Sequence, residues 1–455
     1  MWQLKYLPSC VAVVIGLLGV PVDPSVQPVT PEGLKVMPGR VSRVADQIAQ
    51  DPGGSTHVVF RILRDRKSPV FYSQRTSNVW SEPLQLSADG GTCEDPVVAV
   101  CSDGRLVSSW IDTTDRDSFA LVVRSSQDGG KSWSAEFRHP SGVTRLQPRL
   151  AASGKNVYIC FSSAPAKDAP ERVYFLRSHD AGTTWVQKDL DFKEARHLSS
   201  QVQILTRGEK VWLTWRHEAG AGADVVVNRS TDGGDTWLDR PVTVSEPRPE
   251  RPVDPTFDPT EKDVVVVWQV VYPGSKAIIY EDRSEDGETW GRDRILFQSK
   301  VIPVTYRIVR FGNDRYLLWL GERNLKQRQK AIYWLKLIYP TEVPQHQEVI
   351  HWPGGEQADF SEMDVKIIDK KTLFLAAVAR FGMGDWRLLL LSRKADGEEQ
   401  RWIMGEGDRK ERSCLALVPF GGSIGWLCHE RKARQLPMES LNGSLVFGRL
   451  GEIQN

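Results

Sequence analysis

Short runs rich in β-branched and aromatic residues recur along the whole chain, and glycine, aspartate or proline separates each run from the next. The runs at 106–111, 157–161 and 264–268 are typical. Such runs with turn-forming residues between them predict strands. No segment shows a sustained helical period. The runs follow one another in groups of four, so the sequence predicts repeated units of four short strands.

One motif marks these units at a fixed interval. The pattern Ser-x-Asp-x-Gly-x-x-Trp occurs at 126–133, 178–185 and 230–237, with serines 52 residues apart, and 284–290 is a copy one residue shorter. A short aspartate at a tight turn accepts backbone hydrogen bonds, the glycine supplies a positive φ, and the tryptophan covers apolar surface. A calcium loop would need several oxygen ligands, whereas each motif offers one. We therefore interpret the motif as a structural clip, made of Ser126, Asp128, Gly130, Trp133, Ser178, Asp180, Gly182, Trp185, Ser230, Asp232, Gly234, Trp237, Asp286 and Trp290.

Units of four strands and about 50 residues close into a β-propeller, which hides sheet edges and buries the faces of neighbouring sheets. The expected ends of the third strands, near 73, 126, 178, 230, 284, 336, 392 and 448, define eight units. The sequence thus predicts an all-β fold, a single β-propeller of four-stranded blades over 41–452. Eight blades are expected. Seven would result if the terminal units shared a blade, because ring closure usually pairs the N-terminal strand with the last blade.

The N-terminus has the character of an export signal. Lys5 precedes an apolar run from Val11 to Val20, and prolines end the run. This run fits the core of a signal peptide and is too short for a spanning helix. We expect residues 1–25 to be a signal peptide or an uncleaved anchor and 26–40 a linker. The protein is therefore expected outside the cytoplasm, in the periplasm, at the cell surface or secreted, with membrane contact only if the anchor is retained.

Composition excludes some partners. The net charge of +1 gives no reason to expect nucleic acid as a partner.

Of the 6 cysteines, all but Cys10 follow the export segment, and an odd number of cysteines cannot form a complete disulfide framework. Cys414 and Cys428 flank a turn almost symmetrically and could face each other across a hairpin. The spacing of histidine and cysteine suggests no metal site, and no cofactor is predicted.

The motifs resemble the boxes of the sialidase (BNR repeat) family, over about 41–450. The enzymes of that family are six-bladed exo-glycosidases that remove terminal sialic acid. The resemblance therefore implies a site with three arginines for the substrate carboxylate, a tyrosine nucleophile paired with a glutamate, and an aspartate acid/base. Arg307 opens an expected first strand, and Glu322 and Arg323 end the following one, which fits the family's arginine positions. The family's Arg-Ile-Pro proline is absent. No aspartate lies between Arg323 and Trp334, where the acid/base should follow.

Propeller geometry locates a candidate site without the family. If the boxes lie on one face, the starts of first strands and the ends of second strands lie on the opposite face, around the channel. Many of these positions hold arginine or an acid, and an arginine-rich mouth suits a carboxylate, sulfate or phosphate. The alternative is that these charges pair with one another at a wet rim. The candidate binding residues are Arg61, Arg216, Glu218, Arg307, Glu322, Arg323 and Arg380.

Two functions remain open. One is a binding or scaffold module that recognises an anionic glycan or a protein partner at this rim. The other is an exo-sialidase or related glycoside hydrolase. Arginines can hold a substrate carboxylate, but glycoside cleavage also needs a proton donor and a nucleophile or activated water. Because the family's acid/base has no match here, the sequence favours the binding module, and no residue is assigned a catalytic role.

Overall fold

The computed structural model describes most of the 455-residue chain. The described residues are 22–28, 36–37 and 44–450, except for gaps at 63–66, 77–78, 116, 143–147, 167–168, 191–197, 221, 274–275, 300–302, 325–328, 338–347, 351–357, 369, 382–384, 405–409, 421–422 and 433–443. These residues form strands and turns, with one 3-10 turn, η1 (Val44–Gln47).

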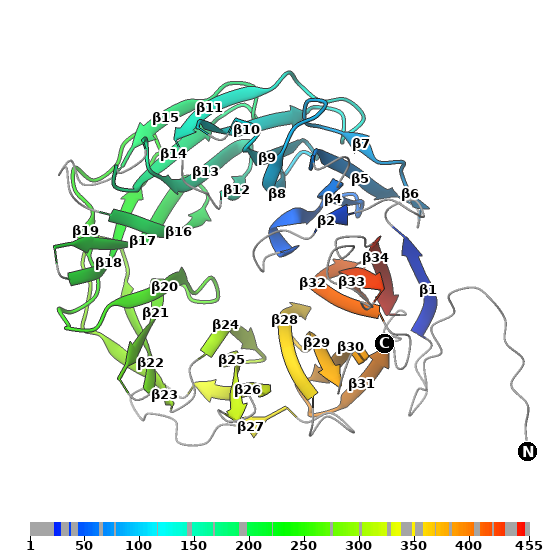
Figure 1. The fold of residues 1–455 in the computed structure, drawn as a ribbon. Helices are drawn as coiled ribbons and strands as arrows, with labels where there is room; N and C mark the ends of the chain where they lie inside the picture. Colours follow the sequence, from blue (N-terminus) through cyan, green and yellow to red (C-terminus); the bar gives the residue numbers. More distant parts are fainter. Residues whose placement is uncertain are drawn as a thin grey trace, which may run out of the picture.

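Strands assemble into sheets that follow one another around a ring, and we number these sheets as blades in chain order (Figure 1). Blade 1 contains β2 (Val36–Met37), β3 (Ile48–Gln50), β4 (Thr56–Ile62), β5 (Val70–Thr76), β6 (Val79–Trp80) and β7 (Leu84–Gln85). Blade 2 contains β8 (Cys93–Val100), β9 (Leu106–Asp112), β10 (Phe119–Ser126) and β11 (Phe137–Gly142). Blade 3 contains β12 (Arg149–Ser153), β13 (Asn156–Ser163), β14 (Arg172–Ser178) and β15 (Val186–Asp189). Blade 4 contains β16 (Leu198–Arg207), β17 (Lys210–Ala219), β18 (Gly222–Ser230) and β19 (Val242–Thr243).

The second half of the chain repeats the plan. Blade 5 contains β20 (Pro252–Phe257), β21 (Val264–Tyr272), β22 (Lys276–Ser284) and β23 (Arg294–Ser299). Blade 6 contains β24 (Pro303–Phe311), β25 (Asp314–Asn324), β26 (Gln329–Leu337) and β27 (Glu348–Val349). Blade 7 contains β28 (Ala358–Ile368), β29 (Thr372–Phe381), β30 (Asp385–Lys394) and β31 (Glu399–Met404). Blade 8 contains β32 (Lys410–Phe420), β33 (Ser423–Lys432), β34 (Ser444–Leu450) and, from the N-terminus, β1 (Val22–Pro28).

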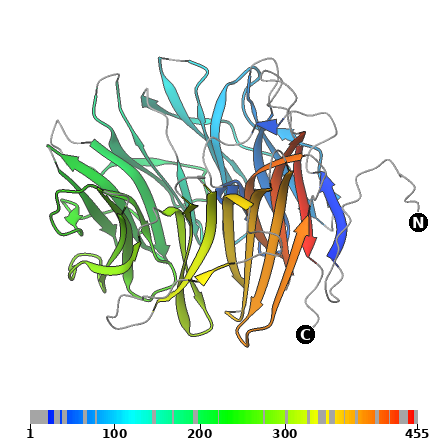
Figure 2. The same cartoon turned by 60° about the horizontal axis from the view of Figure 1, so that its bottom comes forward.

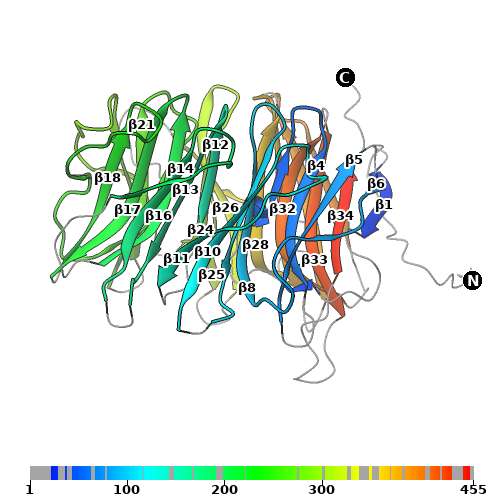
Figure 3. The same ribbon diagram turned by 90° about the horizontal axis from the view of Figure 1, so that it is seen from above.

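Within the described residues, seven sheets have four strands and blade 1 has six, which gives the eight expected blades. In each blade of four consecutive strands, the first strand lies innermost and the fourth outermost (Figure 1). The strands run along the ring axis, so their turns gather on two opposite faces (Figures 2 and 3). The fold is therefore the all-β propeller that the repeats predict.

The N-terminal strand closes the ring. β1 pairs antiparallel with β34, from Val22 opposite Leu450 to Pro28 opposite Val446. β2 pairs with β4. The expected boundary at residue 41 is therefore too late, because parts of the expected export segment and linker belong to the sheets. Strand pairing of this kind could not be found by composition, since the only β-branched residues of β1 are Val22 and Val26.

The core is divided among the interfaces between blades. Side chains alternate along each strand, so Trp212 packs toward blade 5 and Trp215 toward blade 3. Eight hydrophobic clusters of described residues result, one between each pair of successive blades. The cluster of Phe60 and Val418 joins blade 8 to blade 1. Each blade is thus stable only through its neighbours.

The Ser-x-Asp-x-Gly-x-x-Trp segments form the turns between third and fourth strands, and we call them box turns. In blade 3, Ser178 Oγ donates to Asp180 Oδ1 at 2.6 Å and accepts from Gly182 N at 2.7 Å. Asp180 also accepts from the backbone and hydroxyl of Thr184, at 2.8 and 2.7 Å. The turns that start at Ser126, Ser230 and Ser284 have the same serine-to-aspartate and glycine-to-serine hydrogen bonds.

The box turns also join each blade to the preceding one. Trp133 of blade 2 packs on Tyr72 of blade 1, and Trp237 of blade 4 packs on Phe175 of blade 3. A Cβ on Gly130 would lie 2.0 Å from Tyr72 Oη, and φ there is 93°. Glycine is therefore required at this position both for its backbone conformation and for the close approach of the preceding blade.

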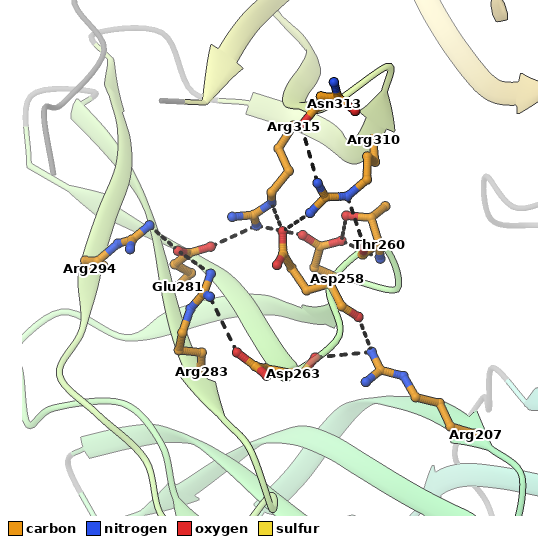
Figure 4. A network of polar contacts seen from close by, with 11 residues as sticks. Arg207, Asp258, Thr260, Asp263, Glu281, Arg283, Arg294, Arg310, Asn313 and Arg315 are labelled. Atoms are coloured by element: carbon orange, nitrogen blue, oxygen red, sulfur yellow. Dashed lines mark hydrogen bonds and ion pairs between the residues drawn. The ribbon is translucent and has the colours of Figure 1, made fainter. Parts of the chain in front are cut away.

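The sequence between β26 and β27 has no Ser-x-Asp-x-Gly-x-x-Trp motif, and an ion-pair network joins blade 6 to blade 5 (Figure 4). Arg315 contacts Asp258 at 2.6 Å, Glu281 at 2.9 Å and Glu261 at 3.0 Å. Arg283 contacts Asp263 at 3.6 Å. In blades 3 and 4 the residues at the position of Arg283, Arg177 and Arg229, instead contact the box turn of the next blade. The network thus takes the place of the missing clip.

Candidate functional site

The face opposite the box turns surrounds the inner ends of the first strands, and we call this region the mouth. The inner strands enter it through irregular pairing, with register shifts between Glu94 and Val97 in β8 and between Val253 and Thr256 in β20. The same irregularity occurs in β16, β24, β28 and β32. Bulges of this kind redirect side chains at the rims of barrels and next to functional sites.

Three of these inner strands hold a non-glycine residue at positive φ. The angles are 47° at Asp95, 60° at Gln201 and 53° at Asp254. Side chains resist this conformation, and it persists only where the surrounding structure imposes it. The three residues occupy matching bulges in blades 2, 4 and 5. The backbone at the mouth is therefore held in the same unusual conformation in three blades.

Polar contacts connect the mouth across blades 4, 5 and 6. Gln201 Nε2 donates to Asp254 Oδ1 at 3.2 Å, and Asp254 N donates to Gln201 Oε1 at 3.0 Å. Tyr306 Oη donates to the carbonyl oxygen of Asp254 at 2.8 Å. The side chains of Gln201 and Asp254 remain exposed. They can therefore meet a ligand while their orientation is fixed.

Two guanidinium groups converge on one carboxylate between blades 4 and 5. Arg216 contacts Glu218 within the same strand at 2.5 Å, and Arg251 contacts Glu218 at 2.6 Å. The Arg251 side chain is 46% exposed. Two guanidinium groups therefore share one carboxylate at this part of the mouth.

The other candidate residues from the sequence come from different blades. Arg307 of blade 6 is half-buried, and its Nη1 donates to Thr305 Oγ1 at 3.1 Å and to the Tyr306 carbonyl at 2.9 Å. Arg380 of blade 7 pairs with Asp359 at 3.3 Å. Glu322 of blade 6 is half-buried at the end of β25, and the side chain of Arg323 lies outside the described residues. The structure thus places Arg216 beside Glu218 and distributes the others around the ring.

Arg61 is positioned differently from the expectation of a ligand-facing group. It is only 4% exposed, and its Nη1 donates to the carbonyl oxygen of Cys93 at 2.8 Å. This bond joins the second strand of blade 1 to the first strand of blade 2. Arg61 therefore has a structural contact between blades, which its position at a strand end did not reveal.

Sequence reasoning alone misses an acidic group at the same face. Glu171 immediately precedes the third strand β14, and starts of third strands also lie at the mouth. Burial raises the pKa of Glu171, and the negative charge of Glu218 raises it further. Burial likewise raises the pKa of Asp224, at the start of β18, against the lowering effect of a hydrogen bond with Ser245. A carboxyl group with a raised pKa beside a charged one is suited to proton donation.

Arg149 is a second group that the sequence did not single out. It begins the inner strand β12. Its Nε donates to Gln203 Oε1 at 3.3 Å, and its Nη1 lies 3.5 Å from Asp46 Oδ2. Arg307 was selected because it opens a first strand, and Arg149 does so too. The same criterion would have found Arg149 if the expected strand had begun one residue later.

Neither a metal centre nor a membrane span is found in the described part of the chain. No group of three histidine, cysteine, aspartate or glutamate side chains there is arranged to hold a metal. No helix there is long and apolar enough to cross a membrane. The apolar run from Val11 to Val20 lies outside these residues, so export stays a prediction.

The expected cysteine pair is only partly covered by the structure. Register places Cys414 in the irregular segment between Ser413 and Ala416, opposite Cys428. The side chain of Cys414 lies outside the described residues, so the disulfide stays a prediction. Cys93, Cys101 and Cys160 are buried free thiols, and burial raises the pKa of Cys93 to about 12 and that of Cys101 to about 11. Such thiols pack as small apolar groups.

The class of protein follows from the fold, which is a β-propeller. Residues 64–258 match the family model of the BNR repeat-like domain. This part of the chain therefore carries a BNR repeat-like domain, and the resemblance to sialidase-type repeat proteins that the box motifs predicted is confirmed.

Solved structures of similar proteins include a protein of unknown function from Dyadobacter fermentans, with 14% identity, a TM-score of 0.42 and coverage of 84% of this chain and 100% of that one. The GH93 α-L-arabinofuranosidase of Fusarium graminearum has 10% identity, a TM-score of 0.41 and coverage of 67% and 97%. The sialidase of Trypanosoma rangeli has 14% identity, a TM-score of 0.37 and coverage of 72% and 56%. No curated protein matches the chain.

Proposed function

We propose that the protein is an exported binding module that recognises an anionic glycan through the mouth, without cleaving it. The observation that supports the proposal is the convergence of Arg216 and Arg251 on Glu218. A guanidinium fork held by a carboxylate is already oriented, so less side-chain entropy is lost when an anionic group binds. The Arg251 side chain is 46% exposed, so an anionic group can approach it from solvent. An acidic protein segment would bind by the same chemistry and is the second outcome of the test.

Glycan binding is tested with the purified protein on an array of carboxylated, sulfated and neutral oligosaccharides. We expect binding of anionic members only, weakened by added salt. Calorimetry on the best ligand should then show affinity reduced about tenfold or more in Arg251→Ala, because charge-assisted hydrogen bonds contribute roughly 1.5–3 kcal/mol. Arg307→Ala tests whether blade 6 shares the ligand.

A matched control is available on the opposite face. Arg105 pairs with Asp103 at 2.7 Å, as Arg251 pairs with Glu218, but beside a box turn. Arg105→Ala should leave the affinity unchanged. Equal binding of neutral and anionic glycans, or equal effects of the two substitutions, would overturn the proposal. Binding of an acidic peptide without any glycan would assign the mouth to a protein partner.

One observation favours a glycoside hydrolase as the second candidate. Glu171 and Glu218 are two carboxyl groups near each other at the mouth, and Glu171 has a raised pKa. Such a pair is what acid/base cleavage of a glycosidic bond requires. Turnover of fluorogenic sialosides and other acidic glycosides, abolished in Glu171→Gln, would replace the binding proposal with an enzymatic one.

A further inference from the structure

The 3-10 turn η1 lies at the inner side of the ring (Figure 1). It immediately precedes β3, the inner strand of blade 1, and it contacts the inner strands β8 of blade 2 and β32 of blade 8. Because starts of inner strands lie at the mouth, η1 also lies there. A short segment from near the N-terminus thus occupies part of the region where the ligand is expected.

η1 carries a carboxylate that reaches across blade 2. Asp46 contacts Arg149 of blade 3, a residue 103 positions away, with 3.5 Å between Oδ2 and Nη1. The side chains of Asp46 and Arg149 are 34% and 15% exposed. Arg149 is held from the other side by Gln203 of blade 4. The Asp46 carboxylate therefore lies against a guanidinium at the start of an inner strand, on the face of the mouth.

We propose that Asp46 is an internal pseudo-ligand, which an anionic saccharide displaces from Arg149 when it binds. The inference rests on the proposed function of the mouth. Long, partly exposed ion pairs contribute little to stability. A ligand carboxylate or sulfate can approach a guanidinium more closely and with two parallel hydrogen bonds. The ligand therefore exchanges one anion for another, and its affinity is lowered by the need to expel Asp46.

The exchange has a consequence for selectivity. A neutral glycan offers no anion to replace the Asp46 carboxylate, so displacing Asp46 would leave Arg149 without its charge partner from η1. The pseudo-ligand thus discriminates against neutral saccharides even where their shape fits the mouth. Discrimination of this kind depends on a penalty against the wrong ligand as much as on contacts with the right one.

Asp46→Asn tests the inference, with 3′-sialyllactose and a chondroitin 4-sulfate disaccharide as probes in calorimetry. We expect the variant to bind the better probe up to about fivefold more tightly than the wild type, since a partly exposed ion pair of up to about 1 kcal/mol no longer competes. Asp103→Asn is the matched control, because Asp103 is 35% exposed and paired with Arg105 on the box-turn face. It should leave the affinity within twofold of the wild type.

A double-mutant cycle assigns the effect to Arg149. In an Arg149→Gln background, Asp46→Asn should no longer raise the affinity. Labelling of Arg149 by phenylglyoxal, followed by mass spectrometry, should increase in Asp46→Asn and decrease again when the probe is added. This second measurement reports on the cover over Arg149 independently of any change in affinity.

The outcomes separate the inference from the proposed function. If the wild type binds a probe and Asp46→Asn binds it no better, the pseudo-ligand is wrong while the binding mouth stands. If Asp46→Asn binds and the wild type does not, the pseudo-ligand is supported in its strongest form. If neither binds any anionic probe, both proposals are overturned. Unchanged labelling of Arg149 in Asp46→Asn would overturn the inference whatever the affinities.

Discussion

At the scale of single residues, the aspartates of the box turns act as local acceptors. Asp180 accepts hydrogen bonds from the hydroxyl groups of Ser178 and Thr184 and from the backbone of Thr184. All of these donors belong to its own turn. The aspartate therefore stabilises the turn that places the following tryptophan against the preceding blade.

We expect Asp180→Ala to lower the free energy of unfolding by roughly 1–3 kcal/mol, because its donors lose their acceptor. Urea denaturation measures the change. Asp180→Asn keeps one acceptor oxygen and should cost less. Ligand binding at the mouth should be unaffected, since the turn lies on the opposite face. Lost binding with an unchanged denaturation midpoint would contradict the structural interpretation of the box.

The same turns make stability depend on acid pH. Hydrogen bonds from the hydroxyl and backbone N–H of Thr236, and from the hydroxyl of Ser230, lower the pKa of Asp232 to about 2. The unfolded value is about 3.9. The contribution of this carboxylate to stability is therefore complete above about pH 4 and is lost as the pH falls toward 2. In Asp232→Asn, stability measured by urea denaturation should fall less between these pH values than in the wild type. Parallel pH curves for the two proteins would refute the assignment.

The residue pattern predicted the serine, aspartate, glycine and tryptophan of the box, because each has a local reason to be there. It did not single out the hydroxyl at the seventh position, which is Ser132, Thr184 or Thr236 in three of the turns. This hydroxyl donates to the second oxygen of the aspartate. The regular recurrence of serine or threonine before tryptophan was visible in the sequence and was the signal that could have found it.

At the scale of elements, the interface between blades 5 and 6 shows how the propeller continues without a box turn. Asp258 and Glu281 are buried, and Arg315 compensates both (Figure 4). These contacts join residues 57 and 34 positions apart. Neither spacing forms a motif, so the network is a product of how two blades meet.

We expect Arg315→Ala to destabilise the protein by about 3–5 kcal/mol, because it leaves the buried Asp258 carboxylate without its cation, whereas Glu281 keeps Arg294. Lys394→Ala is the control. Lys394 pairs with Glu398 in an exposed hairpin of blade 7, and breaking that pair should change the stability little. Urea denaturation compares the two. Similar losses in both variants would show that the network between blades 5 and 6 is dispensable.

Element ends were predictable wherever a turn motif fixed them. The third strands of blades 2 to 5 end at Ser126, Ser178, Ser230 and Ser284, as the box positions predicted.

For the candidate site, the sequence could predict only the face of the propeller on which the side chains lie. Arg216 and Glu218 fall at a strand end on that face and contact each other, whereas Arg61 at an equivalent end is buried against Cys93. Strand position determines the face on which a side chain lies, but packing between blades determines its exposure.

At the scale of the whole molecule, the ring is closed by two independent contacts. Apolar side chains join blades 8 and 1 at the core, and β1 adds the outer strand of blade 8. Without β1, the edge of β34 would present unpaired backbone donors and acceptors to solvent and to other chains. The N-terminal strand therefore links residues near the start of the chain to the stability of the complete ring.

This closure predicts the effect of shortening the N-terminus. A variant that begins at Val29 lacks β1, and it should lose roughly 2–4 kcal/mol of stability, because several backbone hydrogen bonds of about 1 kcal/mol each are removed. It should also self-associate, since the edge of β34 becomes available for pairing. A variant that begins at Pro21 retains β1 and is the control. Thermal denaturation and light scattering distinguish the two, and equal behaviour would refute the role of β1 in closure.

Ring closure also constrains the export signal. If the apolar run from Val11 to Val20 is a cleaved signal peptide, the mature chain must begin early enough to include β1, which starts at Val22. We therefore expect cleavage before Val22, earlier than the end of the expected signal segment at residue 25. The mass of the exported protein measures this position directly. A mature protein that begins after Pro28 would have to close its last sheet without β1, and such a result would show that β1 is not part of the functional fold.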